Sequence, residues 1–115
     1  DRSRRGRVTN KVELTGRLVD PADLRHSPAG VPIARALLEH ESSQLEAGVE
    51  RWVRFRVGLR AAGSPIAETL SELTVGELVS VAGLMLRARQ RNAETDPLII
   101  SVKRLTRLTR LTETA

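Results

Sequence analysis

The residues best suited to chemistry in this sequence lie in the run WVRFRV. Trp52, Arg54 and Arg56 alternate along it, so in a strand they share one face, with Arg51 beside them and Arg60 farther on. An indole ring can stack on a base, and an arginine fork binds phosphate through two parallel hydrogen bonds. The run predicts a surface for single-stranded nucleic acid; the alternative is a solvated strand face that is basic for solubility.

A second basic cluster, made of Arg87, Arg89 and Arg91, has the same alternation. It leads into the polar segment RQRNAETD, which we expect to be a loop between two strands. Two such clusters in one small protein favour nucleic-acid binding over a role in solubility alone.

Other kinds of site find little support. The sequence has no Cys, and His26 and His40 lack the further ligands that a metal site needs. It also has no phosphate-binding glycine loop, no nucleophile elbow and no carboxylate pair in a convincing context. We therefore expect no catalytic residue, metal or cofactor, and interpret the chain as a binding protein rather than an enzyme.

The composition agrees with a small nucleic-acid-binding domain. The 115 residues suit one domain, the net charge is +5, and all basic residues except Lys11 and Lys103 are arginine. A GC-rich genome would also raise the share of arginine, but it would not explain where the arginines sit. No membrane span or signal peptide is visible, so we expect a cytoplasmic protein without a membrane partner.

Hydrophobic alternation and turn residues predict the elements that must position these side chains. Gly16 and Gly83 each interrupt a strand and indicate bends or bulges. Ser64 could cap the helix, with Pro65 as its first residue. The expected elements are strands within 8–19, 49–59, 74–89 and 97–105, a loop at 20–30 and a short helix within 63–73.

The segment VPIARALLEHES, residues 31–42, is ambiguous. Its residues are good helix formers, and Ala34, Leu37 and Leu38 fall near one helical face. However, a helix would have to begin beside Pro32 without a polar capping residue, and the sequence after it reads as a hairpin tip entering a strand. The pattern alone leaves strand and helix open.

If residues 31–42 are a strand, the order is three strands, a short helix and two strands. That order predicts an all-β protein, a five-stranded OB-fold Greek-key barrel with one short helix between strands 3 and 4. The barrel would span residues 8–108, with a basic flexible tail at 1–7 and a flexible C-terminal tail at 109–115. OB-folds bind single strands across the second and third strands and the flanking loops.

The chain resembles the primosomal replication protein N (PriB) family. The resemblance rests on TNKVELTGRL, SPAGVP, LLEHES, Gln44 with EAG, and TVGELVSVAGLM, in matching order from Thr9 to Leu105. It implies that residues 31–42 form a strand running into a hairpin. It also implies a homodimer that binds single-stranded DNA, the PriA helicase, and DnaT or the replicative helicase loader.

The resemblance also bears on the site. Arg25, Arg89 and Arg91 match basic loop positions of the family, whereas Arg54 and Val49 stand where other members carry aromatic residues. We therefore expect weaker and more salt-sensitive DNA binding than in aromatic-rich members, with a larger share of protein bridging. Two alternatives remain: a module for structured RNA or the ribosome, and an adaptor for an acidic protein. The predicted DNA-binding residues are Arg25, Arg51, Trp52, Arg54, Arg56, Arg87, Arg89 and Arg91.

Overall fold

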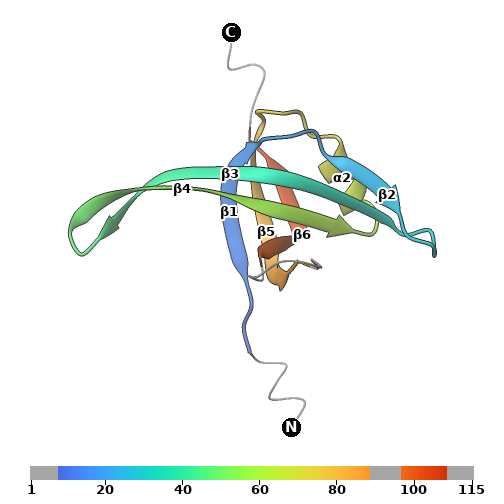
Figure 1. Cartoon of the computed structure of the whole chain (residues 1–115), viewed down its shortest axis with the longest axis horizontal. Helices are drawn as coiled ribbons and strands as arrows, with labels where there is room; N and C mark the ends of the chain where they lie inside the picture. The colour runs from blue at the N-terminus through green and yellow to red at the C-terminus, as the bar shows by residue number, and fades with distance from the viewer. Residues whose placement is uncertain (1–7, 89–96, 109–115) are drawn as a thin grey trace.

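The computed structural model describes residues 8–88 and 97–108, so the two predicted tails lie outside the described residues. The strands form one sheet in the order β1-β5-β6-β4-β3-β2, and pairing of β1 with β3 closes it into a barrel (Figure 1). The elements are β1 (Val12–Leu18), β2 (Asp23–His26), β3 (Pro32–Glu46), β4 (Val49–Ala62), α2 (Ile66–Ser71), β5 (Leu78–Arg87) and β6 (Leu98–Arg107). The predicted all-β barrel is confirmed, with its short helix between β4 and β5.

The ambiguous segment is a strand, as the family resemblance implied. β3 pairs with β4 without interruption from Ile33 opposite Ala62 to Glu46 opposite Val49. The turn between them is only Ala47 and Gly48, both at positive φ, as tight two-residue hairpins require. The resulting long ribbon reaches beyond the barrel (Figure 1). Tertiary pairing here overrides the helix propensity of the residues.

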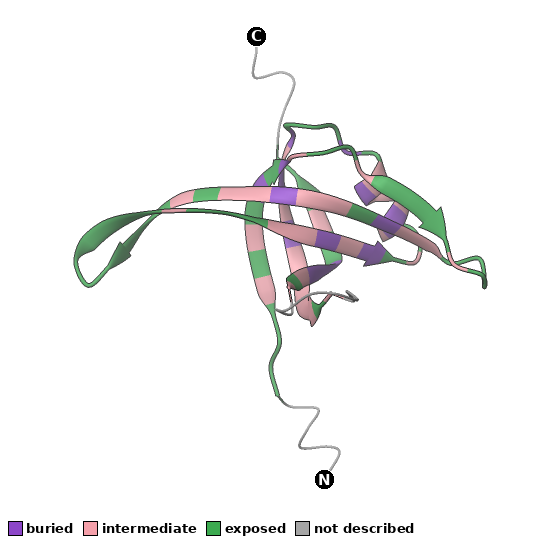
Figure 2. Ribbon diagram, in the orientation of Figure 1, coloured by how far each residue is buried: buried purple, intermediate pink, exposed green. Residues whose placement is uncertain are grey.

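The core is aliphatic and lies inside the barrel. One buried cluster contains Leu18 of β1, Leu38 of β3, Leu59 of β4 and Val81 of β5. Burial is concentrated in the barrel and fades along the β3–β4 ribbon as it leaves the barrel (Figure 2). Phe55 has the parity of an inward residue but is 42 % exposed, because the ribbon has left the barrel at that point.

Gly16 and Gly83 mark two close approaches of backbone. A Cβ on Gly16 would lie 2.5 Å from the carbonyl oxygen of Glu39, where β1 turns from β5 to pair with β3. A Cβ on Gly83 would lie 1.8 Å from the carbonyl oxygen of Ser101, and the β5–β6 register shifts between Ala82 and Gly83. The predicted irregularity at Gly83 is confirmed. At Gly16 the register is regular, so there is no bulge, and the glycine allows the close approach of β1 to β3.

Two local predictions were wrong. The expected loop at 20–30 contains the short strand β2, which pairs with the start of β3. Its side chains are all exposed, so no hydrophobic alternation marked it. Ser64 does not cap the helix: α2 has Pro65 at its N-cap, and the Ser64 hydroxyl donates to Glu68 Oε2 at 2.7 Å instead.

Candidate nucleic-acid interface

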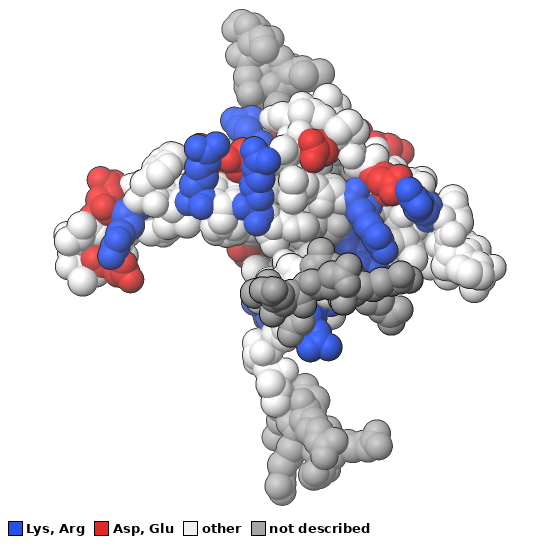
Figure 3. Space-filling view, in the orientation of Figure 1, with Lys and Arg blue, Asp and Glu red and all other residues white. Residues whose placement is uncertain are grey.

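The β3–β4 ribbon has an inner face towards the core and an outer face towards solvent. Trp52, Arg54 and Arg56 share the outer face, as predicted, because alternate residues of a strand point to the same side. They lie on the part of the ribbon from Glu39 to Arg56, which extends beyond the barrel and is called the free arm below. Figure 3 shows basic side chains spaced along the ribbon, with acidic ones among them.

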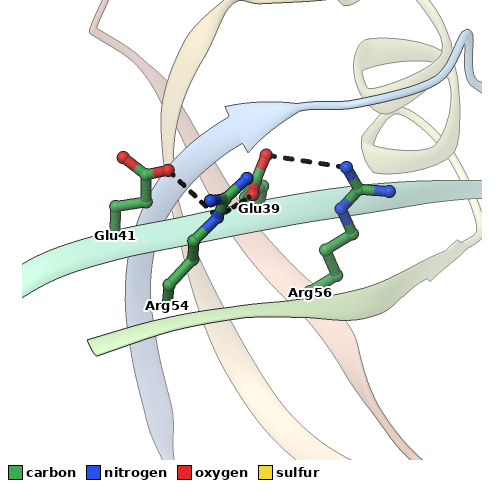
Figure 4. A network of polar contacts seen from close by, with 4 residues as sticks. All are labelled: Glu39, Glu41, Arg54 and Arg56. Carbon is green, nitrogen blue, oxygen red and sulfur yellow. Dashed lines mark hydrogen bonds and ion pairs between the residues drawn. The ribbon is translucent and has the colours of Figure 1, made fainter. Parts of the chain in front are cut away.

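Acidic side chains from β3 lie against the arginines of this face. Arg54 Nε donates to Glu39 Oε2 at 2.7 Å and lies 3.3 Å from Glu41 Oε2 (Figure 4). Arg56 Nη2 lies 4.0 Å from the other oxygen of Glu39. The hydrogen bond from Arg54 holds the pKa of Glu39 below its ordinary value, so the charged pair persists to lower pH than an unpaired glutamate would. The cluster matches two arginines with two carboxylates, so it presents little net charge.

Trp52 is the most prominent aromatic side chain on the surface. It is 67 % exposed and its Cα partner across the ribbon is Ser43, which donates to Glu50 Oε2 at 2.8 Å. Together with Thr15 and His40, it lines a hollow of about 430 Å³ between β1 and the free arm. An exposed indole beside a hollow can stack on an unpaired base.

His40 ties the root of the free arm to β1. Its Nδ1 is 2.7 Å from the carbonyl oxygen of Thr15, and its Nε2 is 2.8 Å from Ser42 Oγ. Its ring also packs on Phe55 at a centroid distance of 5.1 Å. Both ring nitrogens are therefore engaged in structural contacts.

Two further predicted arginines are paired with acids. Arg51 Nε lies 2.8 Å from Glu46 Oε1 near the tip of the ribbon, on the face opposite Trp52. Arg25 of β2 donates from Nε to Asp23 Oδ2 at 2.9 Å. Arg25 is opposite Ile33, so it lies beside the outer face of β3 but far from the tip.

Of the second basic cluster, the structure describes only Arg87, the last residue of β5. Arg89 and Arg91 lie outside the described residues, so their predicted role stays a prediction. Arg87 lines a groove of about 540 Å³ between the ends of β3, β4, β5 and β6.

The same groove is lined by two arginines that the predicted site omitted. Arg35 of β3 and Arg60 of β4 are directly opposite each other on the outer face of the ribbon. Neither makes an ion pair with an acid anywhere in 8–88 or 97–108. Sequence reasoning could have found this pair from the position of the hairpin turn, because a two-residue turn at Ala47 and Gly48 places Arg35 opposite Arg60.

The described part of the chain offers no group of three or more His, Asp or Glu residues arranged to hold a metal ion. No helix within those residues has the length and apolar character to cross a membrane.

Comparison with known proteins identifies the family. A model described as another single-strand binding protein family matches residues 10–102. The replication restart protein PriB of Proteus mirabilis is 34 % identical over 85 residues, covering 74 % of this chain and 81 % of that protein. PriB of Bordetella pertussis is 36 % identical over 81 residues, covering 70 % and 75 %. This chain belongs to the PriB family. The predicted resemblance is confirmed.

Solved structures agree with the family assignment. PriB from Ralstonia solanacearum superposes with a TM-score of 0.72 at 29 % identity, covering 87 % of this chain and 98 % of that one. The single-stranded DNA binding protein of Thermus aquaticus gives 0.72 at 26 % identity, covering 90 % and 52 %. An SSB of Plasmodium falciparum, solved with single-stranded DNA, gives 0.75 at 16 % identity over 90 % and 97 %, a likeness of fold alone. The PriB-family fold of this chain is thus the OB-fold of these proteins.

Proposed function

We propose that this PriB-family protein binds single-stranded DNA as a non-enzymatic accessory factor of replication restart. The observation that carries the proposal is the exposed Trp52 on a ribbon face rich in arginine, in a chain whose relatives are replication restart proteins. Positive charge would capture the DNA backbone, and the indole would stack on one base. The other predicted DNA-binding residues are Arg25, Arg51, Arg54, Arg56, Arg87, Arg89 and Arg91.

The proposal extends to partners. We infer that the protein acts in the cytoplasm as a homodimer that contacts the PriA helicase and helps recruit DnaT or the replicative helicase loader. A strand edge that no described residue pairs with supports the dimer: β1 pairs with β5 from Val12 to Arg17, but with β3 only at Arg17 and Leu18. Such an edge is available to a strand of a second copy.

A second candidate function is that of a protein-bridging adaptor with little affinity for DNA. The acid cluster favours it, because Glu39 and Glu41 occupy the arginines of the free arm. Under this candidate the ribbon would face a protein partner, and the PriA helicase would be the first ligand to test.

Fluorescence anisotropy with labelled oligo-dT, matched duplex DNA and a structured RNA tests the proposal. We expect preference for the single strand, with the slope of log affinity against log salt rising by about 0.7 for each phosphate contacted. Trp52→Ala should lose one base stack, which is worth about 1–3 kcal/mol or roughly fivefold or more in affinity. Arg89→Ala should also weaken binding.

Leu45→Ala is the matched control for Trp52→Ala. Leu45 is an apolar outer-face residue near the tip and is 78 % exposed, so its loss should leave the affinity unchanged. Absent or equal binding to all three nucleic acids at physiological salt would refute DNA binding and favour the adaptor. Tighter binding to the structured RNA would place the protein among RNA-binding OB modules instead.

A further inference from the structure

The Arg35–Arg60 pair is unusual among the arginines of the ribbon. The two residues face each other directly across β3 and β4, an arrangement of like charges that destabilises a sheet. On its other side Arg35 is opposite Asp23, but that carboxylate accepts the hydrogen bond from Arg25 and makes no ion pair with Arg35. The pair therefore holds positive charge that the described residues do not balance.

The surroundings of the pair form a built groove rather than a flat face. Its apolar lining includes Ala36, Gly58, Leu59 and Ile99, and its volume is about 540 Å³. A Cβ on Gly58 would lie 3.0 Å from Cγ2 of Ile99, so the glycine lets the Ile99 side chain of β6 pack closely beside the two arginines. The sheet beneath is held by β6, which pairs with β4 at Gly58 to Arg60. Two arginine forks beside apolar lining residues suit an extended chain of phosphates and sugars.

We propose that the Arg35–Arg60 groove is the main phosphate-binding site for single-stranded DNA in this protein. The strand would be held by charge at the barrel end of the ribbon and would reach Trp52 farther along the same face. Ser43, opposite Trp52, lies eight residues from Arg35 along β3, so the groove and the indole are about 27 Å apart. This inference rests on the proposed function and names the surface that performs it.

The test compares two double variants of the whole chain in the anisotropy titration. Arg35→Ala/Arg60→Ala removes the groove arginines, and the control, Lys103→Ala/Arg104→Ala, removes two exposed basic residues of β6 that do not line the groove. For oligo-dT we expect the groove variant to lose roughly tenfold in affinity near physiological salt and about 1.4 in salt slope. The control should change both quantities by much less.

A second ligand separates phosphate contact from an indirect structural effect. An oligo-dT whose phosphates are replaced by neutral methylphosphonates offers no charge to the groove. The difference between parent and groove variant should therefore vanish with this ligand, whereas the effect of Trp52→Ala should persist. Thermal melting checks the fold: because the change relieves repulsion, the groove variant should melt no lower than the parent.

The outcomes distinguish the two proposals. If the parent binds oligo-dT but the groove variant binds with the same affinity and slope, the groove assignment is overturned while the proposed function stands. If the parent does not bind single-stranded DNA, both are overturned. If the groove variant loses only binding to an acidic polypeptide such as poly-Glu, the groove serves a protein and the assignment also fails.

Discussion

The free arm of the β3–β4 ribbon and its barrel end carry arginines on the same outer face, but in different surroundings. At the barrel end, from Ile33 to Leu38 and from Val57 to Ala62, β6 supports β4 and the core lies directly beneath. Along the free arm β3 and β4 pair with each other, and within the described residues the one further pairing is that of Arg17 with Glu39 at its root. The arginines of the arm make ion pairs with carboxylates, whereas Arg35 and Arg60 make none with any described residue.

This difference shows that the number of arginines in a region does not give the net positive charge available to a ligand, because some arginines are neutralised by carboxylates. In the sequence Arg54 and Arg56 look like the centre of a binding face, yet both already form ion pairs with Glu39 or Glu41. The barrel end has fewer arginines in sequence, but it has a stiff support and unbalanced charge. Substitutions in the two regions should therefore separate effects on stability from effects on binding.

The largest expected difference concerns packing. Leu38 is fully buried at the barrel end, so Leu38→Ala should lower the free energy of unfolding by about 2–5 kcal/mol. Leu45 is 78 % exposed on the free arm, so Leu45→Ala should change it by less than about 0.5 kcal/mol. Urea denaturation followed by circular dichroism measures both. Equal losses would mean that the arm is packed against something in solution and is not free.

The next contrast compares two carboxylates that both accept from an arginine. Glu77 is 8 % exposed in the barrel and is held by two hydrogen bonds from Arg107 and one from the amide of Thr74. These bonds, chiefly those of Arg107, lower the pKa of Glu77 from its ordinary value of 4.5. Because the folded pKa is depressed, the stabilisation is present above about pH 4.5 and is lost as the pH falls through the folded pKa.

Glu77→Gln should therefore lower the free energy of unfolding at pH 7 by about 1–3 kcal/mol and flatten its fall in acid. Glu39→Gln, which breaks the exposed pair of the free arm, should leave the unfolding midpoint at pH 7 almost unchanged. Urea midpoints between pH 7 and pH 3 give the comparison. An acid dependence of Glu77→Gln as steep as that of the parent would contradict the role of Glu77.

The sequence predicted the parts of the fold in which the two faces of a strand differ in burial. Alternation located β1, β4, β5 and β6, and Gly83 indicated the bulge of β5. It missed β2 because every side chain there is exposed, so pairing with β3 leaves no hydrophobic pattern. The choice between helix and strand for β3 depended on pairing with β4, which is not a local property, and only the family resemblance resolved it.

The site was predicted in part for a similar reason. Alternation along β4 put Trp52, Arg54 and Arg56 on one face, which the structure confirms. It could not reveal the acids opposite them, because that needs the cross-strand register. The same register brings Arg35 and Arg60 together from residues far apart in the sequence.

A smaller effect should follow from removing the acids of the free arm. Glu39→Gln/Glu41→Gln keeps the size of both side chains but leaves Arg54 and Arg56 without carboxylate partners. We expect oligo-dT affinity to rise about threefold to tenfold at low salt, with a salt slope steeper by up to about 1.4. Anisotropy titrations at several salt concentrations measure both. Unchanged affinity would show that DNA does not pass over the free arm at all.

The smallest effect should come from the boundary between the two regions. His40 joins the root of the free arm to β1 through the carbonyl oxygen of Thr15, so His40→Ala should lower the free energy of unfolding by about 1 kcal/mol. Since Arg35 and Arg60 lie on the other side of this joint, a DNA site at the barrel end should survive the change, and oligo-dT affinity should stay within about twofold of the parent. A large loss of affinity with intact stability would mean that the orientation of the arm controls binding. Stacking on Trp52 would then contribute more to the affinity for DNA than the positive charge at the barrel end.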